Sequence, residues 1–108
     1  MEPLTPAVFH ILLSLCDEPR HGYGIMLEIA NRTADKVRMG PGTLYGTLLR
    51  MTEAGLVEEC PSDSEQRRRY YRLTSKGRVA AVAEAERLSS LVEDACKKRL
   101  VRQPRLAQ

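Results

Sequence analysis

The sequence predicts a mainly α-helical, α+β fold in which three helices, a two-stranded hairpin and one long helix follow each other. Apolar residues recur at helical spacing before residue 55 and after residue 75, whereas residues 56–60 and 69–74 alternate as strands do. A chain of 108 residues leaves room for one domain. Its 43% hydrophobic and 29% charged residues are ordinary for a globular protein.

The first two helices have clear start signals. Thr5 and Pro6 suit the N-cap and the first position of a helix over residues 7–16. The core face of this helix consists of Val8, Ile11, Leu12 and Leu15. His21-Gly-Tyr-Gly24 opens a second helix that ends near residue 31, and we expect His21 to donate a hydrogen bond to the backbone there. Residues 36–39 are expected to form a brief edge strand.

Residues 39–57 predict a third helix with two distinct faces. Gly40-Pro41-Gly42 marks its start, and Gly55 stands where a C′ glycine would end it. Its apolar stripe consists of Leu44, Leu48 and Met51. On the opposite face we place Thr43, Gly46, Thr47 and Arg50. A helix of this kind could lie in the major groove of DNA, although an ordinary solvated surface helix carries a similar pattern.

The hairpin is strongly basic. Residues 61–78 contain six basic and two acidic side chains, although the net charge of the whole chain is only +3. Arg67, Arg68 and Arg69 follow a polar turn, and we expect one or two of them to contact phosphate or the minor groove. A solubilising loop is the alternative. On the returning strand, we place Tyr71 and Leu73 on the core side and Tyr70 and Arg72 on the outer side.

The last helix is expected to start at Thr74 or Ser75 and to run to about Leu100. A heptad-like apolar stripe follows one face of it and consists of Ala81, Ala85, Leu88, Val92 and Ala95, widened by Leu91 and Cys96. A helix of about 25 residues is roughly 37 Å long, which exceeds the small domain beneath it. A second copy of the chain is the simplest cover for the exposed part of the stripe. The alternative is that the helix folds back on its own domain.

These elements divide the chain into three parts. Residues 1–74 are expected to form a DNA-binding domain, residues 75–101 a dimerisation helix, and residues 102–108 a flexible basic tail. Three helices followed by a two-stranded hairpin is the winged helix-turn-helix arrangement, in which the third helix reads DNA and the hairpin is the wing.

Several short motifs resemble those of the PadR family of bacterial transcriptional regulators. They are His21-Gly-Tyr-Gly24, Gly42-Thr-Leu-Tyr45 with Leu48, Arg50 and Gly55-Leu56, and Arg69-Tyr-Tyr-Arg-Leu-Thr74 with Gly77. They are collinear over about residues 5–78, and together they are specific. The resemblance implies dimeric DNA-binding repressors in which the C-terminal helix packs with the first helix of the partner. Some relatives hold flat ligands between aromatic side chains at the dimer interface, a role that does not carry over to this chain.

The resemblance and the helix faces together predict two groups of site residues. The DNA-binding group is Thr43, Tyr45, Gly46, Thr47, Arg50, Arg67, Arg68, Arg69 and Tyr70. The dimer interface is Val8, Leu12, Leu88, Leu91, Val92 and Ala95. Tyr45 either donates its hydroxyl to a phosphate or braces the wing, and Gly46 permits close approach of the helix backbone to DNA.

Other classes of function find little support in the sequence. Cys16, Cys60 and Cys96 form no CxxC pair, and His10 lies on a different helical face from Cys16, so we expect neither a metal site nor a cofactor. Thiol sensing across a dimer stays open. The chain has no nucleophile–base pair or paired carboxylates typical of an enzyme. It also lacks a signal peptide and an apolar run that could span a membrane, so we expect a cytoplasmic protein without a membrane partner.

The sequence therefore predicts a homodimeric transcriptional regulator whose partners are double-stranded DNA and a second copy of the chain. The expected mode of action is repression at a pseudo-palindromic promoter site, with release by an unidentified small-molecule effector. The alternative is a winged-helix protein-interaction module that does not bind DNA.

Overall fold

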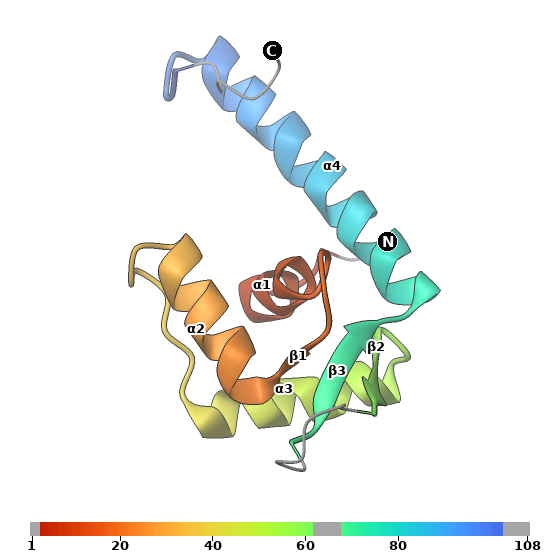
Figure 1. The fold of residues 1–108 in the computed structure, drawn as a ribbon. Coiled ribbons are helices and arrows are strands. Elements are labelled where there is room, and N and C mark those ends of the chain that lie inside the picture. The colour runs from red at the N-terminus through yellow and green to blue at the C-terminus, as the bar shows by residue number, and fades with distance from the viewer. Residues whose placement is uncertain (1–2, 62–67, 103–108) are drawn as a thin grey trace.

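The computed structural model describes residues 3–61 and 68–102, and Figure 1 shows the arrangement of their helices and strands. In chain order the elements are α1 (Pro6–Ser14), β1 (Arg20–His21), α2 (Gly22–Arg32), α3 (Pro41–Glu53), β2 (Val57–Cys60), β3 (Tyr70–Leu73) and α4 (Ser75–Lys97). Three helices surround a common core, a small sheet closes one side of it, and α4 crosses the other side. The predicted winged helix-turn-helix fold is confirmed.

The helices begin at side chains that satisfy free backbone N–H groups. The Thr5 hydroxyl accepts a hydrogen bond from the Val8 amide, and the Thr74 hydroxyl accepts one from the Gly77 amide. At the start of α2 the Nδ1 atom of His21 accepts a hydrogen bond from the Gly24 amide. The expectation that His21 donates to the backbone is therefore wrong, because the first turn of a helix offers N–H donors.

The sheet contains a strand that sequence reasoning placed elsewhere. Its order is β1-β3-β2 with antiparallel pairing, and Arg20 lies opposite Tyr71. The expected strand at residues 36–39 is absent from the described structure, since this segment forms a turn and an extended loop. Ala34 and Asp35 have left-handed φ angles of 52° and 63°, which bend the chain after α2. Instead β1, which directly precedes α2, pairs with β3 on the side opposite to β2.

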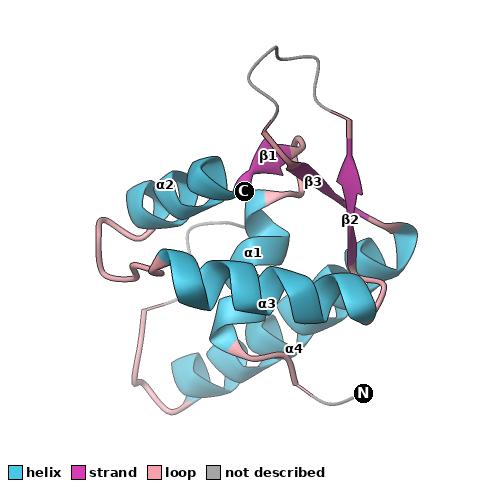
Figure 2. Cartoon of the chain, turned by 90° about the horizontal axis from the view of Figure 1, so that it is seen from below, coloured by secondary structure: helices cyan, strands magenta, loops and turns pink. Residues whose placement is uncertain are grey.

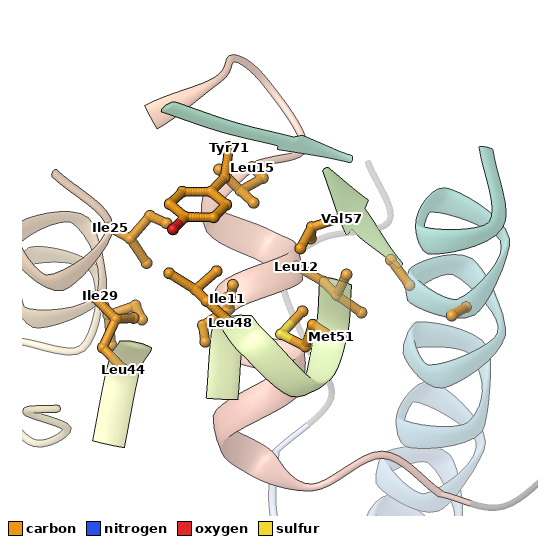
Figure 3. Packing of buried hydrophobic residues seen from close by; sticks show 12 residues of the cluster. Ile11, Leu12, Leu15, Ile25, Ile29, Leu44, Leu48, Met51, Val57 and Tyr71 are labelled. Carbon is orange, nitrogen blue, oxygen red and sulfur yellow. The ribbon is translucent and has the colours of Figure 1, made fainter. Parts of the chain in front are cut away.

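The core lies where α1, α2, α3, the sheet and the first part of α4 meet, and Figure 3 shows its side chains converging from these elements. It consists of Ile11, Leu12, Leu15, Ile25, Ile29, Leu44, Leu48, Met51, Val57, Tyr71, Ala80 and Ala81. The predicted inward faces of the first and third helices are confirmed, except that Val8 is only partly buried. On β3 the expected sidedness holds, since Tyr71 is buried and Arg72 is exposed.

Helix α4 is only partly covered by the rest of the chain. Its first half packs against α1, and its second half extends away from the body (Figure 1). The molecule measures 51 × 29 × 28 Å along its principal axes. The helix ends at Lys97, before the expected Leu100, and Arg99 then adopts a left-handed φ of 62°. The predicted basic tail lies outside the described residues from position 103 onwards. None of the described helices is both long and apolar enough to cross a membrane.

Candidate nucleic-acid interface

Helix α3 and the strand pair β2–β3 lie next to one another in the fold. Figure 2, seen from below Figure 1, shows α3 with α4 behind it and the strands beside it. The polypeptide enters α3 through Gly40 and Pro41, and the helix ends before Gly55, whose φ of +78° is the left-handed C′ conformation expected from the sequence.

The outer surface of α3 carries most of the predicted polar face. Thr43 and Arg50 are exposed, Tyr45 is 47% exposed, and Gly46 is half-buried beside the Arg50 guanidinium. The helix contains no acidic residue before Glu53. This surface combines a hydroxyl, a phenol, a patch of accessible backbone and one positive charge, which are the groups that contact base edges and phosphates.

Thr47 does not belong to this surface. Its side chain is buried, at 2% exposed, and its hydroxyl donates to the carbonyl of Thr43 at 2.7 Å and accepts from Arg50 at 3.3 Å. At 100° per residue, position 47 lies beside positions 44, 48 and 51 and therefore within the buried stripe. The sequence-based placement of Thr47 on the exposed face is wrong, because its polarity was weighed above its helical position.

Tyr45 joins α3 to the start of α2. Its hydroxyl and ring atoms lie so close to Gly22 that a Cβ at position 22 would collide with them. Gly22 is buried, and a larger residue in this place of the His21-Gly-Tyr-Gly24 motif would displace the Tyr45 ring from the start of α2. Tyr45 therefore packs on the start of α2, while its 47% exposure leaves part of the residue at the surface.

The wing arginines differ in how their charges are balanced. Arg69 and Arg72 lie 3.6 Å from Glu59 and 2.9 Å from Glu58 on the neighbouring strand. Arg68 is exposed and has no ion pair within residues 3–61 and 68–102; its guanidinium lies against His21 instead. Arg67 lies outside the described residues. The carboxylates on β2 therefore offset part of the positive charge that the sequence predicted for the wing.

Two surface features of this region were missed by sequence reasoning. Leu49 is 63% exposed on α3, and its position away from the apolar stripe was the available signal. His21 stands beside the wing, with its ring edge-to-face against Tyr70 at a centroid distance of 5.3 Å. Burial, and then the charge of Arg68, lower the pKa of His21 below its ordinary value. Only the pairing of β1 with β3 brings these groups together.

His10 and Cys16 each make contacts within the domain. His10 faces Arg32, whose Nη2 lies 3.3 Å from the imidazole Nδ1, and the Cys16 thiol donates to the Leu12 carbonyl at 3.2 Å. Within the described part of the chain, no three histidine, cysteine or acidic side chains are grouped as a metal site would require.

The predicted dimer residues differ in how exposed their side chains are. Leu91 and Val92 are 52% and 39% exposed on the projecting half of α4, and Leu88, Ala95 and Val8 are partly buried. Leu12 is fully buried in the core of its own protomer, so it cannot contact a partner, and its assignment to an interface is wrong. Residue 12 lies on the inner face of α1 because that face also covers α3 and α4.

A three-helix scaffold whose third helix has no acidic residue before Glu53 and lies beside a strand pair with exposed arginines defines a winged-helix protein. The comparison with known proteins makes this assignment specific. The sequence profile of the transcriptional regulator PadR-like family matches residues 11–83, which is most of the chain. The chain belongs to this family. The predicted resemblance is confirmed, and the family is one of transcriptional regulators.

Individual relatives agree with the family assignment. The chain is 35% identical over 91 residues to transcriptional regulator Rv3488 of Mycobacterium tuberculosis, covering 79% of this chain and 78% of that protein. It is 37% identical over 81 residues, or 75% of its length, to an uncharacterized 37.1 kDa protein in transposon TN4556 of Streptomyces fradiae, and spans only 22% of that protein. A solved transcriptional regulator from Clostridium thermocellum superposes with a TM-score of 0.74 at 26% identity, over 85% of this chain and 87% of that one.

Proposed function

We propose that this chain is a homodimeric DNA-binding repressor that places α3 in the major groove and the wing on the adjacent backbone. The observation that carries the proposal is the outer surface of α3, which is free of acidic side chains before Glu53 and lies beside the β2–β3 pair, with the exposed Arg68 just before β3. In this arrangement Thr43, Gly46 and Arg50 approach the bases, while the wing arginines contact phosphates.

The second copy of the chain would pack on the projecting half of α4. The buried residues of α4 include Ala81 and Glu84, and the same helical face continues through Leu88 and Leu91 beyond the body of the domain. A face that is apolar and covered at one end and exposed at the other fits a second protomer. Two α3 helices related by a twofold axis would read half-sites about 34 Å apart, which makes the operator pseudo-palindromic.

In this proposal, repression follows from competition for promoter DNA in the cytoplasm. A small-molecule effector would release the DNA by changing the angle between the two protomers, and hence the spacing of the α3 helices. Affinity would come from phosphate contacts, while specificity would come from α3 and from DNA shape.

Salt-dependent DNA binding tests the proposal. Duplexes that the wild-type protein selects from random DNA are titrated at two or more salt concentrations. The R68A/R69A variant should bind more weakly, with a log–log salt slope shallower by about 0.9 for each phosphate contact that it loses. The K97A/K98A variant is the matched control, because it also removes two exposed positive charges but does so at the end of α4.

The two variants separate the candidate functions. Equal losses in both variants would indicate nonspecific attraction by overall charge and would contradict an α3–wing interface. A wild-type protein that shows no salt-sensitive binding and selects no sequence would instead support the protein-interaction module.

A further inference from the structure

The capping role of His21 determines which of its ring nitrogens carries the proton. The Gly24 amide donates to Nδ1 across 3.0 Å, so Nδ1 must have a free lone pair. A neutral imidazole has one lone pair and one N–H group. With Nδ1 as the acceptor, Nε2 carries the hydrogen and acts as a donor on the outer side of the ring.

The group that faces Nε2 of His21 is the guanidinium of Arg68, which is also a hydrogen-bond donor. Nη1 of Arg68 lies 3.1 Å from Nε2 of His21. A guanidinium donates hydrogen bonds and accepts none. The two nitrogen atoms come from the start of α2 and from the wing, and they approach one another without an acceptor between them. An anionic oxygen beside this pair would satisfy both N–H groups at once.

The surroundings hold the imidazole in this orientation. The ring of His21 packs edge-to-face on Tyr70, its partner across the β1–β3 pair, with an interplanar angle of 88°. Tyr45 approaches from α3, over the neighbouring Gly22. The adjacent Arg20 is engaged elsewhere, since it pairs with the carboxylates of Asp17 and Glu18. In the described residues, Arg68 is therefore the charged group that faces the outer nitrogen.

The charge balance of the wing favours an external anion at this point. Arg69 and Arg72 each have a glutamate partner on β2, whereas Arg68 has none within the described residues. The pKa of His21 lies below its ordinary value because of burial and of the Arg68 charge, which keeps the ring neutral and preserves its acceptor at Nδ1. An arginine with no carboxylate partner in residues 3–61 and 68–102 and a neutral N–H donor together suit a singly charged phosphodiester.

We propose that His21 and Arg68 together bind one backbone phosphate of DNA and so connect the wing to the start of α2. This inference rests on the proposed DNA-binding function and adds to it a phosphate contact outside α3. In the bound state the Nε2–H of His21 and the guanidinium of Arg68 donate to oxygens of the same phosphate, while Nδ1 continues to cap α2. Arg68 supplies the charge, and His21 supplies a neutral hydrogen bond.

The H21N and R68A variants test this division of roles. Asparagine is a good N-cap, and its side-chain oxygen can replace Nδ1, but it places no donor at the position of Nε2. H21N should weaken binding to the selected duplex about tenfold with an unchanged salt slope, because no charge is lost. R68A should weaken binding and also reduce the slope by about 0.9. The double variant should bind nearly as well as R68A alone, because both residues serve one phosphate.

A second measurement leaves the protein's fold unperturbed. Duplexes that carry a single neutral methylphosphonate, moved along the backbone one position at a time, are titrated with the wild-type protein and with H21N/R68A. At one position per half-site the substitution should weaken the wild type and leave the double variant unaffected. Thermal unfolding of H21N checks that the α2 cap is intact.

The possible failures can be distinguished. Wild-type affinity in H21N, independent losses in the two single variants, or the absence of a shared methylphosphonate position would overturn the phosphate contact while leaving DNA binding in place. If the wild-type protein shows no salt-sensitive binding to any duplex, the proposed function and this contact both fail.

Discussion

Two glycines of this chain have opposite surroundings. A Cβ at Gly77, in the first turn of α4, would collide with the backbone carbonyl of Leu56, whereas a Cβ at Gly42 would meet no atom within 4 Å. We expect G77A to lower the free energy of unfolding by at least about 2 kcal/mol, because backbone must move. G42A should leave it unchanged or raise it by up to about 1 kcal/mol, since alanine is the better helix former. Urea denaturation of the two variants measures both values, and equal effects would contradict this account.

Both histidines should make the stability of the fold depend on pH. Burial lowers the pKa of His10 and of His21, and neighbouring Arg32 and Arg68 lower them further. Below about pH 6.5 the unfolded chain therefore binds protons more readily than the folded one. We expect the melting temperature to fall as the pH is lowered through about 6.5 towards the folded-state pKa values. Thermal unfolding from about pH 8 to about pH 5.5 measures this slope.

The variant H10Q/H21N is the control for this pH dependence. It should show a flatter dependence over the same interval, because glutamine and asparagine do not titrate. An unchanged slope would mean that other groups govern the effect. The carboxyl group of Glu84 acts at lower pH, since the hydrogen bond from Arg87 lowers its pKa, and its contribution is lost only as the pH falls through that lowered value.

At the scale of elements, α3 was predicted almost completely. The glycines and proline at its start, the C′ glycine and the apolar stripe are local signals, and all appear in the structure. The width of the stripe was underestimated. Thr47 lies within it and satisfies its hydroxyl inside the helix, so its polarity does not require exposure.

The exposed apolar side chains of α4 allow a test of the proposed dimer. Leu91 and Val92 are exposed on its projecting half, and L91E/V92E would place two charges in the proposed dimer interface. We expect the wild type to sediment at micromolar concentration as a dimer of its 12.2 kDa chain, and this variant to sediment as a monomer, because burying unpaired charges is unfavourable.

The matched control lies on the same helix. Val79 and Val82 are also exposed, at 62% and 53%, but lie on the opposite face from the proposed interface. V79E/V82E should remain dimeric. Dissociation of both variants would indicate a loss of α4 itself, and a monomeric wild type would remove the dimer from the proposed function.

In the whole molecule, the proposed DNA-binding face and the free end of α4 lie at opposite ends (Figure 1). A dimer joined through α4 would therefore determine the separation of its two α3 helices by the direction in which α4 leaves the domain. That direction depends on contacts with α1 and on Glu84, which accepts a hydrogen bond from the Leu4 amide and pairs with Arg87. The carboxylate of Glu84 connects the N-terminal segment to α4, and no local sequence pattern indicated this contact.

The sequence by itself determined the order and type of nearly all elements and the family of the protein. N-caps, the left-handed Gly55 and apolar periodicity act within a few residues, so they can be recognised along the chain. Tertiary structure alone decided that β1 rather than residues 36–39 completes the sheet, that Leu12 is internal, and that His21 faces Arg68. These outcomes depend on contacts between residues that are distant in the sequence, and such contacts exist only once the helices and strands have packed together.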